Sequence, residues 1–367
     1  MSEFKSHTAR ARIEAMLLEL GATLASVDVL QPAEPFLDTA GDELRRRIFM
    51  ARGVDGRNVC LRPEFTIPVC LQHVHNGLQH TRHGYVGEVF REGRAEGMEF
   101  SQAGIEDLGD ADRIAADARV IGDALAMVEA MDAGKTAKLT IGDQNVFDAV
   151  LKALELPSGW RARLADVFGD GEAMSVQLAA LSKPKEMPDL PPAILHALTS
   201  RDAEKLSSEI AVALNEAGLS QSGGRTAEEI AKRLMSKHLD TKHAAAPKRV
   251  AQLEAFLSIQ VPLNDAPSAL AGFADAAGID LHAALTNFEA RIEAMAGLDL
   301  DRMEYAASFG RALDYYTGLV FEVREDDGTV LVGGGRYDRL LEMLGAENPI
   351  PGVGFSIWLD RLNGGAS

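Results

Sequence analysis

The sequence predicts an α+β fold in which an antiparallel-rich sheet, flanked by helices, is split by a mostly helical insert. Runs rich in β-branched and aromatic residues at 83–90, 98–109 and 319–323 are typical of strands. The last run leads through a DDG turn at 326–328 into TVLV, which predicts a β-hairpin. Between these strand regions, helical patterns rich in Ala, Leu, Glu and Lys fill about 145–296.

The N-terminal region contains a helix and a hairpin. Apolar residues at helical spacing between Ile13 and Leu20 predict a helix, and Gly21 is placed to cap its C-terminus. IFMA at 48–51 and NVCL at 58–61 predict two strands joined by the turn sequence GVDGR. Both elements belong to the part of the chain that precedes the insert.

Further helices and strands follow in order. We expect Thr66 to be the N-cap of a helix from about 67 to 79. An alanine-rich amphipathic pattern predicts a long helix from about 110 to 131. Further strands are predicted at KLTIGD (138–143) and EYAASF (304–309).

The composition shift suggests two domains. Residues 1–144 and 297–367 form the predicted mixed domain, and 145–296 form the helical insert, which PSG, QSGG and a proline-rich stretch interrupt. The last segment of the mixed domain, PGVGFSIWLDRL at 351–362, predicts a strand that leads into a helix. The chain is long enough to bury a sizeable core in either arrangement.

Charge and cysteine content narrow the partner and the compartment. The 37 Lys and Arg against 55 Asp and Glu give a net charge of −18, which would repel tRNA, so a small metabolite or another protein is the better partner. Cys60 and Cys70 lie among apolar neighbours and are expected to be reduced and buried. The sequence has no apolar signal segment and no membrane-spanning run, so we expect a cytoplasmic protein.

Four of the nine histidines cluster after LRPEFT, at His73, His75, His80 and His83. Their spacing does not place the nearest pair at i and i+4 on one helix face, as a zinc-binding pair would be. We therefore expect exposed or interfacial histidines here and no metal site. No cofactor is expected either.

The stretch 310–340 carries the strongest functional signal in the residues themselves. Arg311 supplies a cation, Tyr315 and Tyr316 supply apolar area and hydrogen bonds, and glycines 333–335 would let the backbone approach a ligand. These features predict a small-ligand pocket. The alternative is that the glycines only end the hairpin and the tyrosines only pack.

Five separated stretches resemble one family, the histidyl-tRNA synthetase-like proteins with a class II aminoacyl-tRNA synthetase fold. They are LRPEFT (61–66), FREGRAEGMEFSQAGIE (90–106), GRALDYYTGLVFE (310–322), GGGRYDRL (333–340) and PGVGFSIWLDRL (351–362). Together and in this order they are specific, whereas a lone GGRYD would not be. The resemblance implies an antiparallel class II sheet flanked by helices.

The resemblance also implies roles for matching positions. The residues that resemble those holding free histidine in the synthetases are Glu64, Thr66, Gln102, Glu106, Arg311, Tyr315 and Tyr316. Carboxylate and amide oxygens suit the α-ammonium of histidine, a cation suits its carboxylate, and Glu106 or a tyrosine suits its imidazole. The alternative is that Glu64, Glu106 and Arg311 pair among themselves without a ligand. For Arg336 and Tyr337, a structural role and a ligand contact both remain open.

Three departures from the synthetases bear on catalysis. The loop after Arg91 offers only Arg94 against three glutamates, where the family has a basic loop that clamps ATP. Trp358 stands where the family has a glycine under the adenine, and Asp360 stands where it usually has glutamate, although the motif arginine Arg361 is retained. The chain stops soon after this motif, so we expect no anticodon-binding domain.

A retained histidine pocket beside a decayed ATP site resembles the synthetase paralogues that are regulatory subunits of ATP phosphoribosyltransferase, the first enzyme of histidine biosynthesis. This resemblance implies a non-catalytic protein that dimerises within a hetero-oligomer, activates the short catalytic subunit and passes on feedback inhibition by histidine, an allosteric effector. The rival from the enzyme class is a truncated histidyl ligase that forms histidyl-adenylate. A third hypothesis is an assembly partner with a vestigial pocket.

Overall fold

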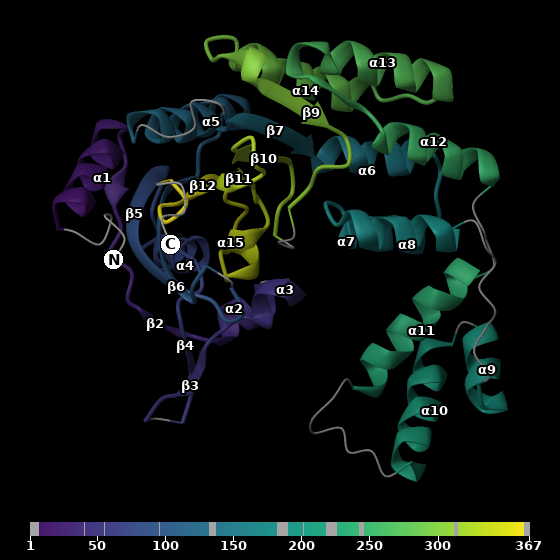
Figure 1. Ribbon diagram of the computed structural model, residues 1–367. Helices are drawn as coiled ribbons and strands as arrows, with labels where there is room; N and C mark the ends of the chain where they lie inside the picture. The colour runs from purple at the N-terminus through teal and green to yellow at the C-terminus, as the bar shows by residue number, and fades with distance from the viewer. Residues whose placement is uncertain are drawn as a thin grey trace. The chain divides into compact units, whose positions relative to one another are not determined.

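The computed structural model describes residues 7–39, 41–54, 56–94, 96–131, 137–181, 190–200, 202–217, 226–241, 246–311 and 315–362 (Figure 1). The chain divides into two compact units. The first comprises Met1–Ala149, Phe168–Asp170 and Ala255–Ser367, and the second comprises Val150–Val167 and Gly171–Glu254. The domain boundaries expected from the sequence, at 145 and 296, differ from this division, because residues after 255 contribute to the sheet of the first unit.

In the first unit the described residues form a nine-stranded sheet with the order β1-β5-β6-β12-β11-β10-β7-β9-β8. Its strands, in sheet order, are Thr23–Leu24, Thr81–Phe90, Glu99–Leu108, Gly352–Trp358, Val330–Arg336, Leu319–Arg324, Lys138–Asp143, Met303–Ala306 and Gln260–Pro262. The pairs β1–β5 and β7–β9 are parallel, and the other pairs between these described strands are antiparallel. The antiparallel-rich α+β prediction is confirmed.

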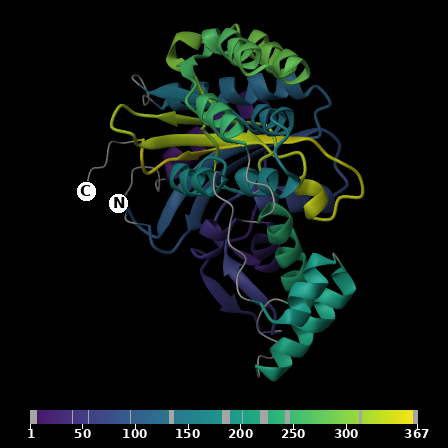
Figure 2. The same ribbon diagram turned by 90° about the vertical axis from the view of Figure 1, so that its right-hand side faces the viewer.

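Helices cover both faces of this sheet. The helices of this unit are α1 His7–Glu19, α4 Thr66–His75, α5 Arg113–Ala130, α13 Ala266–Ala277, α14 His282–Ala294 and α15 Leu340–Met343. Two more helices, α6 Gln144–Ala153 and α12 Pro247–Leu257, each have residues in both units. Side chains alternate between the faces along each strand. Glu106 points toward α4, whereas Asp107 points toward α5, where it meets Arg119. The helices α13 and α14 lie beside the β9–β8 edge (Figures 1 and 2).

A small antiparallel sheet precedes α4. Its order is β2-β4-β3, with bounds Leu30–Pro32, Asn58–Leu61 and Met50–Arg52. This confirms the hairpin that IFMA and NVCL predict. The short helices α2 Glu34–Thr39 and α3 Asp42–Arg45 lie between β2 and β3 along the chain, and the 3-10 turns Leu263–Asp265 and Leu300–Arg302 flank α13 and α14.

The second unit is helical, with α7 Ser158–Asp166, α8 Gly171–Leu181, α9 Pro192–Thr199, α10 Ala203–Glu216 and α11 Ala227–Thr241. Ile194, Leu198, Leu206 and Ile210 are part of its apolar core. Side-chain caps define two of its helix starts. Asp202 is the N-cap of α10 and accepts from the backbone N–H of Lys205. Thr226 and Glu229 form a capping box at α11, in which each side chain accepts from the other residue's backbone N–H.

Two local predictions are wrong. Residues 359–362 form turns after β12 rather than the expected helix. Glycines 333–335 lie inside β11 rather than after it, because β10 and β12 pair with them on either side. An exposed run of glycines weakens a strand and tends to end it, but here the neighbouring strands β10 and β12 supply hydrogen bonds to the glycines. Within the described helices, none combines the length and apolarity that crossing a bilayer would need.

Candidate functional site

A cavity of about 350 Å³ lies over one face of the four central strands β6, β12, β11 and β10. This volume is at the small end of ordinary ligand sites. The structure brings together in its lining all seven residues predicted to bind a ligand: Glu64, Thr66, Gln102, Glu106, Arg311, Tyr315 and Tyr316. The retained Arg91 also lines it, whereas Arg361 lies outside the lining.

Glycines make the floor of this cavity flat. Glu106 pairs with Gly354 across β6 and β12, and Gly333 pairs with Glu322 across β11 and β10. A Cβ on Gly354 would overlap the Glu106 carboxylate, and a Cβ on Gly333 would overlap the Arg311 guanidinium. The glycines therefore make space for two ionisable side chains that lie flat on the sheet.

The N-terminus of α4 supplies one polar end of the cavity. Thr66 was expected to cap this helix, but Phe65 occupies the cap position and the Glu64 carboxylate does the capping. Its two oxygens accept from the backbone N–H groups of Thr66, at 2.6 Å, and Ile67, at 2.9 Å. A carboxylate is favoured here by the free N–H groups and the helix dipole. Burial nevertheless raises the pKa of Glu64.

Glu106 is the most heavily hydrogen-bonded acid in the cavity. It accepts from the hydroxyls of Thr66, at 2.7 Å, Tyr85, at 3.2 Å, and Tyr337. Burial raises the pKa of Glu106 to about 8, and the hydroxyl donors oppose that rise. The carboxyl is therefore largely protonated in the ligand-free protein at neutral pH, so a cationic ligand would recruit its charged form.

Gln102 has an unused acceptor beside these acids. The residue is 1% exposed, and its side-chain oxygen has no hydrogen-bond partner among the described residues. Leaving a buried acceptor unpaired costs about 1–3 kcal/mol. A donor group on a ligand would satisfy it.

Four arginines contribute cations to the cavity lining: Arg47, Arg91, Arg311 and Arg324. Arg311 pairs with Glu322, so within the described structure it does not lock onto Glu64 or Glu106 as the ligand-free alternative required. Glu322 also pairs with Arg324. Burial lowers the pKa of Arg91 to about 10, partly offset by Glu64, and the group stays charged at neutral pH.

Three tyrosine rings form an aromatic wall. The Tyr315 ring centroid lies 5.0 Å from that of Tyr316 and 5.8 Å from that of Tyr337. Tyr337 both lines the cavity and donates to Glu106, so it belongs to the site as well as to the fold. The sequence analysis left the role of Tyr337 open. It did not predict Glu322 as a site residue, although the alternation of side chains along β10 could have placed that acid beside Gly333.

The residues that depart from the synthetase pattern, together with the retained Arg361, contact one another or the cavity. Trp358 lines the cavity and is 8% exposed. Arg361 lies with its guanidinium carbon 5.2 Å from the Trp358 ring and donates to Glu96 at 3.1 Å. Arg94 pairs with Asp360 at 2.6 Å and is 6% exposed at its side chain. Both arginines are thus engaged within the protein.

Comparison with known proteins identifies the family. The sequence profile of the histidyl-tRNA synthetase family matches residues 5–237 and 210–362. The ATP phosphoribosyltransferase regulatory subunit of Rhizobium rhizogenes is 51% identical over 91% of this chain and 91% of that protein. The regulatory subunit of Mesorhizobium japonicum is 47% identical over 96% of this chain and 95% of that protein. The chain belongs to the ATP phosphoribosyltransferase regulatory subunit family.

Solved structures confirm the predicted fold of this regulatory-subunit family member. A Bacillus halodurans protein described as an ATP phosphoribosyltransferase regulatory subunit/histidyl-tRNA synthetase gives a TM-score of 0.63 at 18% identity, covering 96% of this chain and 76% of that one. Histidyl-tRNA synthetase from Nostoc sp. gives 0.62 at 17% identity, with coverages of 96% and 69%. The class II histidyl-tRNA synthetase-like fold is therefore shared.

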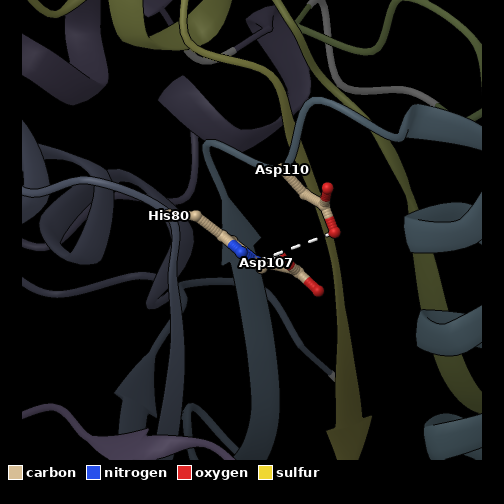
Figure 3. A group of neighbouring side chains, drawn as sticks. All are labelled: His80, Asp107 and Asp110. Atoms are coloured by element: carbon tan, nitrogen blue, oxygen red, sulfur yellow. Dashed lines mark hydrogen bonds and ion pairs between the residues drawn. The ribbon is translucent and has the colours of Figure 1, made fainter.

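The histidine cluster lies apart from the cavity. The expectation of exposed or interfacial histidines is wrong for His73 and His83, which are buried and meet at 3.1 Å between Nδ1 and Nε2. His80 lies 2.8 Å from Asp107 and 3.8 Å from Asp110, a grouping whose spacing would allow a metal ion (Figure 3).

Arginines already neutralise this acidic pair. Asp107 accepts from Arg82 at 3.1 Å and from Arg119 at 2.8 Å, and Arg119 also bonds Asp110 at 2.6 Å. Guanidinium groups at these distances would repel a cation. The arrangement is an ion-pair network that joins β5, β6 and α5.

Proposed function

We propose that this chain is the non-catalytic regulatory subunit of an ATP phosphoribosyltransferase, and that its cavity binds free histidine as an effector. The names of the relatives support the first part. One observation supports the second: two buried acids, a partly buried arginine and an amide oxygen with no partner among the described residues line one cavity of amino-acid size.

The acceptors fit the ammonium group of an amino acid. The only hydroxyl proton of Thr66 goes to Glu106, so Thr66 can present only lone pairs to a ligand. Glu64 uses one lone pair on each oxygen for the α4 backbone and keeps others. Together with the free oxygen of Gln102, this set can accept all three ammonium protons.

The cations and the spacing fit the rest of histidine. Gly354 and Gly333 are diagonal neighbours on adjacent strands, about 7–8 Å apart, so Glu106 and Arg311 above them leave room for a small zwitterion. Arg311 would bind the carboxylate. The imidazole would meet Glu106 or the tyrosine wall, which together offer an acceptor and aromatic faces.

Ligand analogues test the cavity directly. Calorimetry should show histidine binding to the purified protein. Histidinol, which lacks the carboxylate, and imidazole propionate, which lacks the ammonium, should each bind at least tenfold more weakly. Equal binding of all three compounds would refute the assignment of the acids to the ammonium group and of Arg311 to the carboxylate. The absence of heat with histidine would favour a vestigial pocket.

The regulatory role requires a partner, which we propose is the short catalytic subunit of ATP phosphoribosyltransferase in a hetero-oligomer with dimers of this chain. The two proteins should co-purify, and the catalytic subunit should gain activity in the complex and lose it on addition of histidine. Arg311→Ala should abolish inhibition while retaining activation. Arg249→Ala, which alters a partly exposed ion pair with Glu155, is the matched control.

The rival histidyl ligase makes a different prediction. Such an enzyme would exchange pyrophosphate into ATP in the presence of histidine. We expect background exchange only, because the buried Trp358 stands where the resemblance implies a glycine under the adenine, and Arg94 is paired with Asp360. Robust exchange would overturn the non-catalytic assignment without touching histidine binding.

A further inference from the structure

A three-residue turn, Phe168–Asp170, joins the helical unit to the cavity. Along the chain it connects α7, which ends at Asp166, to α8, which begins at Gly171. The turn itself belongs to the sheet-containing unit, although both helices belong to the other. Gly169 lines the cavity that contains Arg311.

The turn packs directly on the backbone that precedes Arg311. A Cβ on Gly169 would overlap the main chain of Gly310, and a Cβ on Gly310 would lie 2.6 Å from the Phe168 ring. On the other side, a Cβ on Gly142 would overlap the carbonyl of Phe309. Main chain therefore touches main chain, and the segment before Arg311 cannot shift without moving the turn.

Phe168 anchors the turn. It is 7% exposed, and its ring stacks on that of Phe147 in α6, with centroids 4.4 Å apart and planes 16° from parallel. Only Val167 separates Phe168 from the end of α7. The turn and the end of α7 are therefore immediate neighbours along the chain.

We infer that occupation of the cavity is transmitted through the contact between Gly310 and Gly169 into helix α7. This inference rests on the proposed binding of histidine. The Arg311 guanidinium, paired with Glu322 without a ligand, must turn toward a ligand carboxylate, and Gly310 is its covalent neighbour. The coupling requires only that histidine binds one arrangement of this contact better than another.

Tryptophan positions allow this to be measured. The chain has two tryptophans, Trp358 in the cavity and Trp160 within α7. In a Trp358→Phe protein, histidine should change the Trp160 emission, saturating with the dissociation constant that calorimetry gives for the same protein. In the unsubstituted protein, amide exchange in α7 should slow at least threefold with histidine, and exchange in α10 should not change.

Glycine variants test whether the signal passes through the contact between Gly310 and Gly169. Gly169→Ala, in the Trp358→Phe background, should reduce the Trp160 response per bound histidine by more than half. Two other glycines serve as controls, because a Cβ on Gly171 or on Gly278 would meet nothing within 4 Å. Gly278 also has a positive φ, +65° against +92° for Gly169, so it controls for the backbone strain of the substitution. Gly171→Ala and Gly278→Ala should keep the full response.

Three outcomes are distinguishable. Calorimetric binding with unchanged Trp160 emission and unchanged α7 exchange would refute the transmission but leave histidine binding intact. A full response in Gly169→Ala would refute the route. No calorimetric binding in the unsubstituted protein would instead refute the proposed function.

Discussion

Replacing Glu106 by glutamine tests the central electrostatic feature of the cavity. The carboxyl is buried, accepts from Thr66, Tyr85 and Tyr337, and has a pKa of about 8. Glutamine keeps the shape and a carbonyl acceptor for the hydroxyls, but it cannot ionise. The substitution therefore removes the titration while disturbing the packing little.

The size of the effect follows from linkage. The ordinary value of the carboxyl pKa is 4.5, so between pH 4.5 and about 8 the folded state holds a proton that the unfolded state has lost. The raised pKa therefore costs stability as pH increases through this window. At 1.36 kcal/mol per pKa unit, the wild-type protein should lose about 2–3 kcal/mol relative to Glu106→Gln between pH 5 and pH 7.

Denaturant unfolding without histidine at pH 5, 6, 7 and 8 measures this difference. Glu228→Gln, which changes an exposed carboxylate on α11, controls for general titration. Parallel pH profiles for the wild-type protein and Glu106→Gln would refute the reasoning. Added histidine should reduce the difference in unfolding free energy between the wild-type protein and Glu106→Gln, because a cation beside the carboxylate lowers the pKa of Glu106.

Proton release on binding gives an independent measure. With a pKa of about 8, Glu106 is mostly protonated at pH 7, so a histidine ammonium or imidazole that needs the carboxylate should displace close to one proton. Calorimetry in two buffers of different ionisation enthalpy reports this number. Glu106→Gln should release none and bind histidine more weakly, and unchanged proton release would contradict the assignment.

The remaining predictions concern three other residues. Arg311→Ala should weaken histidine binding by about 2–5 kcal/mol by calorimetry, and an unchanged dissociation constant would contradict the pocket assignment. Asp117→Asn should cost about 3–5 kcal/mol in thermal unfolding, because buried Arg291 and Arg336 both donate to Asp117. Trp358→Gly should not restore pyrophosphate exchange, because Arg94 remains paired with Asp360; activity in this variant would refute that reasoning.

Local patterns predicted most elements of the fold. The β-branched runs became β5, β6 and β10, and the alanine-rich pattern became α5, because strand and helix periods are properties of neighbouring residues. The errors arose where pairing with strands distant in the sequence determined the secondary structure. β10 and β12 drew glycines 333–335 into the sheet, and β8 at 260–262, within the expected helical insert, joined its edge by pairing with β9.

Motif spacing and family resemblance were sufficient to predict the kinds of groups that the site contains, because they name residues but not their partners. Which atoms meet depends on how the strands pair. Antiparallel pairing set Glu106 beside Gly354 and Gly333 beside Glu322. Strand register, established between residues far apart along the chain, therefore placed Arg311 beside Glu322 and left the oxygen of Gln102 without a partner among the described residues.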